Sequence, residues 1–252
     1  MQGSERLSVK SCRRRRSGTA QSGCLHFGCG QADLVCVRLC FKRFFQSGVL
    51  TEPDVYSMLF SDKRFERQMG GIMEWIEEVK AKIKKKNQVL FGKDSEYLQD
   101  LAELLQNQDH RTAALWAFDL AAESIAELKE KYPEEVRPEE ALKAVRDWSA
   151  GKIKMRLAQR KILDCHAFAK EIDCKEDIAL CHAIGQACAV VHTAGHAIGY
   201  PIYDLTAVVY RLGIDNCIEA VEKRRQEYID RLFYWREHLS DYEGEWADFM
   251  LK

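Results

Sequence analysis

From residue 72 onward, apolar residues recur at every third or fourth position, with charged residues between them. The segments 72–86 and 95–108 show this spacing clearly. Residues three or four apart lie on one face of an α-helix, so the spacing predicts amphipathic helices. The alternation of apolar and polar residues that is typical of strands is absent from the sequence. The chain is therefore predicted to be all-α.

Proline, glycine and capping residues mark where these helices begin and end. Ser95 and Asp109 are candidate N-caps. The helix that follows Asp109 is expected to end before Pro133, because proline inside a helix costs about 3 kcal/mol. Pro138 fits the first turn of the next helix, and Gly151 fits its C-terminal end. The short connections favour antiparallel neighbours, so we expect a bundle of about seven or eight main helices.

The chain divides into a basic N-terminal part and an acidic remainder. Residues 1–70 contain 12 basic and 6 acidic side chains and carry a net charge of +6, whereas residues 71–252 carry −7. We predict a basic Ser/Gly/Cys-rich and poorly ordered extension over 1–35, short helices of unclear packing over 36–68, and an all-α domain over 69–252. The formal charge of the whole chain is −1, which gives no general attraction to nucleic acid or membranes.

The extension contains the unbroken basic run Arg13–Arg16. A nucleic-acid-binding arm is one interpretation of this run, and a simple tail is the other. An extracellular disulfide framework does not fit long helices, so we expect the 10 cysteines to be reduced thiols in a cytoplasmic protein. No apolar run approaches the roughly 20 residues that span a bilayer, and no membrane segment is expected.

The stretch from Cys181 to Pro201 is rich in histidine, alanine and glycine. Its many small residues are typical of a central, closely packed helix. On one helix over residues 180–200, the apolar side chains share one face and a polar face lies opposite. The polar face consists of His182, Gln186, His192, Thr193, His196 and Tyr200. The first and last of its histidines are separated by about 21 Å along the axis, too far to share one ion.

Only His192 and His196, at positions i and i+4 of such a helix, have the spacing to bind one metal ion. Thr193 stands where the HExxH zinc-protease motif has its glutamate base, so that chemistry is not expected. A third ligand would come from another helix, with His166 and Asp164 as candidates. We favour structural histidines and no cofactor; a metal-binding all-α enzyme that uses the pair is the alternative.

Neither thiol catalysis nor phosphate binding has a recognisable motif. Cysteine and histidine are sequence neighbours at 165–166 and 181–182, and side chains of adjacent residues in a helix point about 100° apart. The sequence has no Gly-rich phosphate loop and no G-x-S-x-G elbow. We therefore expect a protein that is not an enzyme.

Residues 111–210 carry a recognisable combination of motifs. They include Trp116-Ala117 with Asp119 and Glu123, Tyr132-Pro133, Arg137-Pro138 with Ala141, Arg146 with Trp148 and Gly151, and His192 with His196-Ala197. In this combination the chain resembles the immunity-protein-five-like family of predicted bacterial immunity proteins, which are associated with polymorphic toxin systems. The resemblance implies a helical protein that binds and neutralises a cognate toxin, and it implies no catalytic residues.

Two acidic regions are candidates for partner binding. The first surrounds the turn before Pro138 and consists of Glu134, Glu135, Glu139 and Glu140. The second is the C-terminal segment with Tyr242 and Trp246, since aromatic residues often anchor interfaces. A basic partner would be attracted by the net charge of residues 71–252. Ordinary solvated surface is the alternative for both regions.

Overall fold

The computed structural model describes residues 63–252, with side chains from residue 74 onward. The predicted extension over 1–35 and the predicted short helices up to residue 62 lie outside the described residues. Contacts group Phe60–Lys252 into one unit. Helix is found from residue 63, earlier than the apolar spacing indicated, so residues 63–68 belong to the first described helix.

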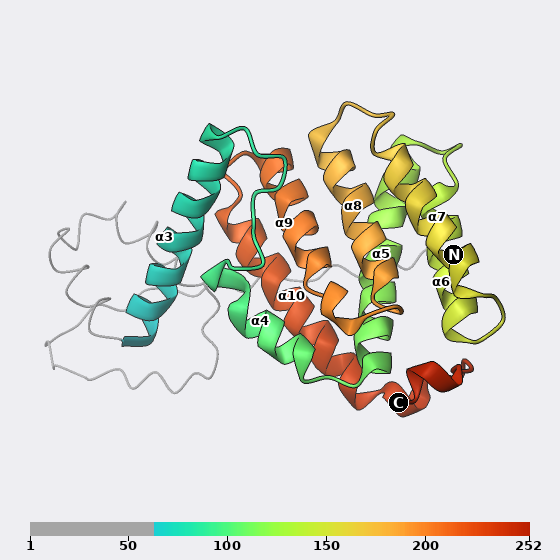
Figure 1. Cartoon of the computed structure of the whole chain (residues 1–252). Helices are drawn as coiled ribbons and strands as arrows, with labels where there is room; N and C mark the ends of the chain where they lie inside the picture. The colour runs from blue at the N-terminus through green and yellow to red at the C-terminus, as the bar shows by residue number, and fades with distance from the viewer. Residues whose placement is uncertain (1–62) are drawn as a thin grey trace, which may run out of the picture. The chain divides into compact units, whose positions relative to one another are not determined.

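The described part of the chain contains eight α-helices and three short 3₁₀ helices, and no strand (Figure 1). The α-helices are α3 (Lys63–Lys84), α4 (Glu96–Gln106), α5 (His110–Lys131), α6 (Arg137–Ser149), α7 (Met155–Phe168), α8 (Lys175–Ala189), α9 (Gly199–Leu212) and α10 (Ile218–Glu237). The 3₁₀ helices are η1 (Ala194–His196), η2 (Leu239–Asp241) and η3 (Asp248–Met250). The prediction of an all-α bundle with seven or eight main helices is confirmed.

Helices α5 to α10 pack in two layers of three. One layer runs α7, α8, α9 and the other runs α6, α5, α10, as the contacts between neighbouring helices show (Figure 1). Helix α8 contacts α5, α6, α7 and α9, so it is the central helix of the domain. Its buried side chains include Ala179, Ala183 and Ala187, whose small size lets the neighbouring helices approach closely.

The helix ends follow the sequence signals, with one exception. The carboxylate of Asp109 accepts a hydrogen bond of 2.8 Å from the backbone N–H of Arg111, which confirms the N-cap of α5. Gly151 follows α6 with a φ of 74°, a left-handed conformation that glycine adopts without strain. Ser95 precedes α4 but makes no capping bond. Its hydroxyl instead donates to Glu78 Oε2 at 2.6 Å, so a contact with α3 replaces the predicted cap.

A buried polar network connects α5, α9 and α10. Asp204 is 4% exposed and accepts hydrogen bonds from Arg224 Nε at 2.7 Å and from the Tyr228 hydroxyl at 2.5 Å. The Tyr200 hydroxyl donates to the carbonyl of Leu120 at 3.0 Å, and Arg224 Nη2 donates to Tyr200. We call Tyr200, Asp204, Arg224 and Tyr228 the buried network. Burial raises the pKa of both tyrosines far above the ordinary value, so both hydroxyls remain protonated donors.

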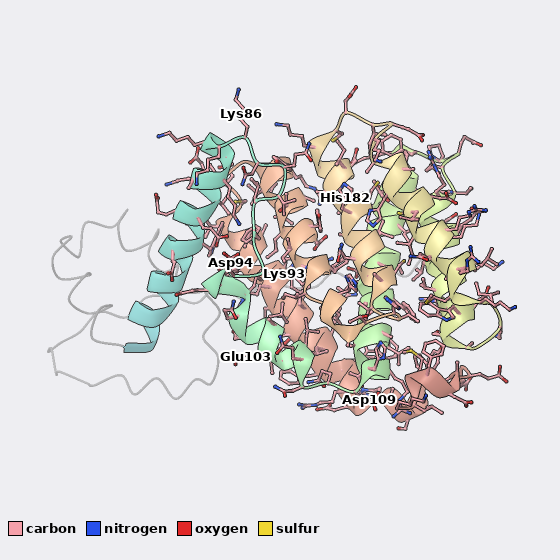
Figure 2. All side chains as sticks on the ribbon, in the orientation of Figure 1. Lys86, Lys93, Asp94, Glu103, Asp109 and His182 are labelled. Atoms are coloured by element: carbon pink, nitrogen blue, oxygen red, sulfur yellow. The ribbon has the colours of Figure 1, made fainter. Side chains whose placement is uncertain are left out.

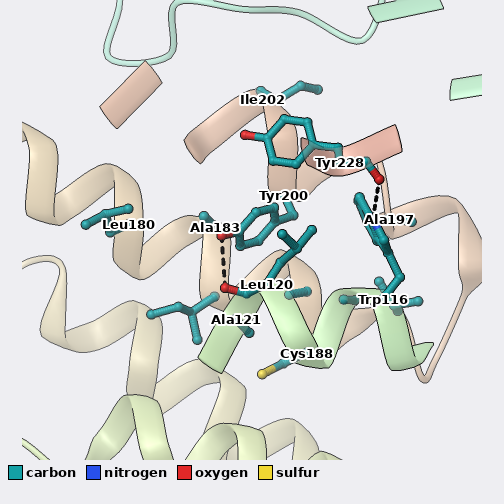
Figure 3. Close-up of a cluster of buried hydrophobic side chains, with 14 of the residues drawn as sticks. Trp116, Leu120, Ala121, Leu180, Ala183, Cys188, Ala197, Tyr200, Ile202 and Tyr228 are labelled. Carbon is teal, nitrogen blue, oxygen red and sulfur yellow. Dashed lines mark hydrogen bonds between the residues drawn. The ribbon is translucent and has the colours of Figure 1, made fainter. Parts of the chain in front are cut away.

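Trp116 joins this network to the hydrophobic core. Its indole N–H donates to the carbonyl of Tyr228 at 2.9 Å, and Figure 3 shows this bond beside the one between Tyr200 and Leu120. The Trp116 and Tyr228 rings meet edge to face at 6.3 Å between centroids. Aromatic contacts of this kind add to the free energy of area burial. The network therefore fixes three helices in one arrangement.

Replacement of Asp204 by asparagine tests the contribution of this network to stability. The variant keeps the shape of the side chain but leaves the charge of Arg224 without its closest carboxylate. We expect the free energy of unfolding to fall by about 3 kcal/mol, as for other broken buried ion pairs. Urea denaturation followed by circular dichroism measures the change.

The control is Glu139→Gln, which removes the exposed ion pair with Lys129. Exposed pairs contribute less than about 1 kcal/mol. Equal losses of stability in the two variants would contradict the special role of Asp204.

Candidate functional site

The histidine-rich stretch is not one continuous helix. Helix α8 ends at Ala189, a turn and η1 follow, and α9 begins at Gly199. The prediction of a single helix over residues 180–200 is therefore wrong. Thr193 has an extended backbone, and Gly195 within η1 and Gly199 at the start of α9 each make a continuous helix less favourable by about 1 kcal/mol. Because these residues do not form one α-helix, His192 and His196 do not lie on the same helix face.

The six residues of the predicted polar face separate into three groups. Tyr200 is fully buried and belongs to the network described above. His192 and Thr193 are exposed in the turn after α8. His182 and Gln186 lie one helical turn apart on α8, and His196 Nδ1 is 3.2 Å from Gln186 Oε1. Of the six residues of the predicted polar face, the structure thus keeps only His182, Gln186 and His196 near one another.

A row of three rings crosses α7, α8 and α9. His166 Nδ1 lies 2.9 Å from His182 Nδ1, and the two ring centroids are 5.1 Å apart. The Tyr203 ring follows at 5.2 Å from that of His182. We call His166, His182 and Tyr203 the histidine row; His182 is labelled in Figure 2. The sequence named His166 only as a possible third ligand for the other histidine pair, and its contact with His182 was missed.

Gly185 makes room for the His166 ring. A β-carbon at this position would lie 2.2 Å from His166 Cε1, closer than any real contact. Any other residue at position 185 would therefore displace the ring or separate α7 from α8. The Cys-His dipeptides at 165–166 and 181–182 were the available sequence signal, since each places one histidine on one of the two helices.

Both histidines of the row are neutral rings at pH 7. Burial lowers the pKa of His166 to about 4, and the nearby charges of His182 and Lys170 contribute. Burial also lowers the pKa of His182. One Nδ1 carries the proton and donates to the other, which accepts. The two rings are therefore hydrogen-bonded to each other in the uncharged state, and protonation of both would leave no acceptor between them.

The cysteines beside these histidines are inert. Cys165 and Cys181 are buried, and the thiol of Cys165 donates to the carbonyl of Cys181 at 3.6 Å. Burial raises the pKa of Cys165 to about 12, so a thiolate does not form near neutral pH. All five cysteines of the described residues are free thiols.

Most of the candidate acidic turn is engaged in local ion pairs. Glu135 accepts hydrogen bonds from the backbone N–H and the guanidinium of Arg137, which hold its pKa below the usual range. Glu139 pairs with Lys129 and Glu140 pairs with Lys161, at 3.2 and 2.8 Å. Glu134 is exposed, and no ion pair to it is found among the described residues. It is the carboxylate of this turn that is most available to a partner.

A groove of about 320 Å³ lies between α5 and α6. It is lined by Ala122, Ile125, Glu139, Leu142, Lys143, Arg146 and Asp147. Ile125 and Leu142 form an apolar base and are each 7% exposed, while the charged residues form the rim. Glu139 belongs both to the groove and to the acidic turn, so the two features are continuous. No signal in the sequence indicated the groove, because it depends on how α5 and α6 pack.

The C-terminal segment packs against the end of α6. The backbone N–H of Ala247 donates to the carbonyl of Ser149 at 2.7 Å, and the Phe249 ring stacks on Trp148 at 5.2 Å. Tyr242 and Trp246 are half-buried, contact each other and pack against the core. Each aromatic ring is therefore only partly accessible to a partner. A role of these two residues in partner binding stays a prediction.

The side chains that the structure describes contain no group of three or more His, Cys, Asp or Glu that would hold a metal ion. His192 lies near Trp148, with 6.2 Å between ring centroids, and His196 near Gln186. The pair proposed for a metal-dependent enzyme thus lacks both its helical spacing and an acidic third ligand in this part of the chain. Among residues 63–252, no helix is long and apolar enough to cross a membrane.

The neutral histidine pair predicts a loss of stability in acid. The unfolded His166, with an ordinary pKa near 6.5, takes up a proton that the folded ring does not take up until the pH approaches 4. Stability is therefore complete above about pH 6.5 and falls below it. We expect a loss of about 1–2 kcal/mol between pH 7 and pH 5, less than the full shift implies because the ring is partly exposed to solvent.

Denaturation at a series of pH values tests this expectation. His166→Gln should remove this part of the pH dependence, whereas His192→Gln, at an exposed position, should keep it. An unchanged pH dependence in His166→Gln would show that the pair is not its source.

Comparison with known proteins gives one family. The model of the family described as "Imm-5 like putative immunity protein" matches residues 103–232, slightly more than half of the chain. The match extends from α4 to α10 and includes the groove, the acidic turn and the histidine row. No curated protein and no solved structure matches the chain. Because the match covers more than half of its length, the chain belongs to this family, the Imm-5-like family.

Proposed function

We propose that this protein binds a cognate bacterial toxin in the cytoplasm and neutralises it by occupying the toxin surface. The family membership carries this proposal, since the matched family is one of immunity proteins. The protein would act by binding and not by catalysis. Its partner is identified only by chemistry, as a protein toxin with a basic surface.

The groove between α5 and α6 is the surface that fits a protein partner best. Hot spots of protein interfaces are side chains that insert into well-packed pockets and are surrounded by polar contacts. The base formed by Ile125 and Leu142 provides such a pocket, and Glu139, Lys143 and Asp147 provide a charged rim. The guanidinium of Arg146 is held 5.5 Å from the Phe118 ring, so this part of the rim is already ordered. An ordered surface reduces the entropy lost on binding.

The charge of the domain supports a basic partner. Residues 71–252 carry a net charge of −7, and Glu134 is exposed in the turn that precedes Glu139, which lines the groove. Long-range attraction between opposite charges raises association rates. The acidic turn thus contributes to the rate of encounter, and the groove contributes to the lifetime of the complex. Tyr242 and Trp246 belong to this proposal as a second, peripheral contact.

Co-expression with the product of the adjacent gene tests the function. Wild-type protein should restore growth to cells that produce this toxin. Ala122→Arg should lose protection and bind the purified toxin at least tenfold more weakly, because Ala122 is exposed in the groove and a long side chain would fill it. Ala126→Arg is the matched control, since Ala126 is exposed one turn further along α5 and does not line the groove.

The possible failures have different meanings. If the adjacent product is harmless, or the wild-type protein gives no protection, the immunity function is wrong. If both arginine variants protect equally well, the function stands and the groove is the wrong surface.

Charge reversal separates the acidic turn from the groove. Glu134→Lys combined with Glu139→Lys should lower the association rate with the toxin about tenfold at low salt and change the dissociation rate little. The difference should shrink as salt screens the charges. Glu103→Lys with Asp94→Lys makes the same change in net charge at α4 and in the loop before it; both residues are exposed and labelled in Figure 2. Stopped-flow binding that responds equally to the two double variants would contradict a specific role of the turn.

A further inference from the structure

The histidine row has no part in the proposed toxin contact. Its residues belong to α7, α8 and α9, whereas the groove lies between α5 and α6. His166 and His182 nevertheless place two ring nitrogens 2.9 Å apart, and the His166 ring packs directly against Gly185. Both rings are half-buried, so solvent reaches the pair from one side. This arrangement of two convergent imidazoles calls for a chemical explanation of its own.

We propose that His166 and His182 form a binding site for one transition-metal ion, represented by Zn²⁺, which links α7 to α8. Imidazole nitrogen is a preferred ligand of zinc, copper and nickel, whereas magnesium and calcium prefer oxygen. The site differs from the pair His192 and His196, because it joins two helices through side chains that already touch. The proposed metal site is separate from the immunity function and does not depend on it.

The distances require little movement. Two nitrogens bound to a tetrahedral zinc at about 2.0–2.1 Å lie roughly 3.3–3.4 Å apart, and the centres of their rings lie about 5 Å apart. The ring centroids of His166 and His182 are 5.1 Å apart, while the Nδ1 atoms are 2.9 Å apart. The rings therefore already have the separation that a shared ion requires. To admit the ion, each ring has to tilt so that the nitrogens move apart by about half an ångström and their lone pairs converge on one point.

The hydrogen bond between the two rings fixes which nitrogens carry hydrogen before metal binds. In the free protein one Nδ1 carries a hydrogen and donates it to the other. Metal binding requires both rings to carry their hydrogen on Nε2, so one proton moves through solvent from Nδ1 to Nε2 of the same ring. No net proton is released, and both Nδ1 lone pairs bind the ion.

The protein supplies two of the four zinc ligands, and water supplies the others. The partial exposure of both rings leaves room for these waters. Tyr203 packs against His182 at 5.2 Å and limits how far that ring rotates, so it acts as a positioning residue. An open site with two protein ligands is expected to bind zinc more weakly than closed structural sites with four.

Equilibrium dialysis of the full, untagged chain against ZnCl₂ at pH 7.5 tests the site. We expect wild-type protein to bind one equivalent of zinc more than His182→Gln or His166→Gln, since glutamine retains hydrogen bonding but is a poor zinc ligand. Zinc held elsewhere, for example by the cysteines of residues 1–62, is common to all three proteins and cancels. His192→Gln should bind as much as the wild type, and MgCl₂ should not compete.

A melting experiment gives a second, independent readout of the site. Zinc should also raise the melting temperature of the wild type and not that of the His182→Gln variant. Equal zinc content in wild type and both row variants would overturn the proposal, and so would loss of the additional equivalent in His192→Gln.

A measurement on the wild-type chain alone keeps the test valid if the variants do not fold. Zinc should protect His166 and His182 from modification by diethyl pyrocarbonate, as measured by mass spectrometry of the peptides, and should leave His192 reactive. Unprotected His166 and His182 at saturating zinc would overturn the site. Zinc binding by the purified chain requires no toxin, so its failure and a failure of the immunity function are distinguishable.

Discussion

The buried ion pair between Asp204 and Arg224 is the interaction on which the rest of the domain depends. It joins α9 to α10, and the hydroxyls of Tyr200 and Tyr228 complete the hydrogen bonds of its charged groups. A buried charge is tolerated only when such partners are present, so few other arrangements of α9 and α10 would satisfy this ion pair. Through Tyr200 and Trp116 the same network reaches α5. The position of α5 in turn determines the groove that it forms with α6.

The sequence predicted the elements of the fold because each depends on local chemistry. The end of α5 before Pro133 follows from the missing N–H and fixed ring of proline, and its start follows from the carboxylate of Asp109. The error over residues 180–200 also has a local cause. The periodic pattern predicted one helix over these residues, although Gly195 and Gly199, on either side of His196, have a low helix propensity. Tyr200, expected on the polar face of that helix, is instead fully buried in α9, which begins at Gly199.

The candidate sites were harder to predict, because they combine residues from different helices. His166 and His182 are 16 positions apart, and only the packing of α7 on α8 brings their rings together. The groove likewise requires Ala122 and Leu142 to face each other across two helices. The acidic turn was visible in the sequence, but its ion pairs with Arg137 and Lys129 were not. These pairs leave Glu134 as the carboxylate most open to a partner.

Hydrogen–deuterium exchange of this protein, free and mixed with the product of the adjacent gene, tests the proposed toxin contact most directly. An immunity protein that uses the groove should show slower exchange on complex formation in the second half of α5, the acidic turn and α6, over residues 122–147. Exchange in α7 to α9 should change little. Protection confined to α7, α8 and α9, or no protection at toxin concentrations that saturate binding, would contradict the account.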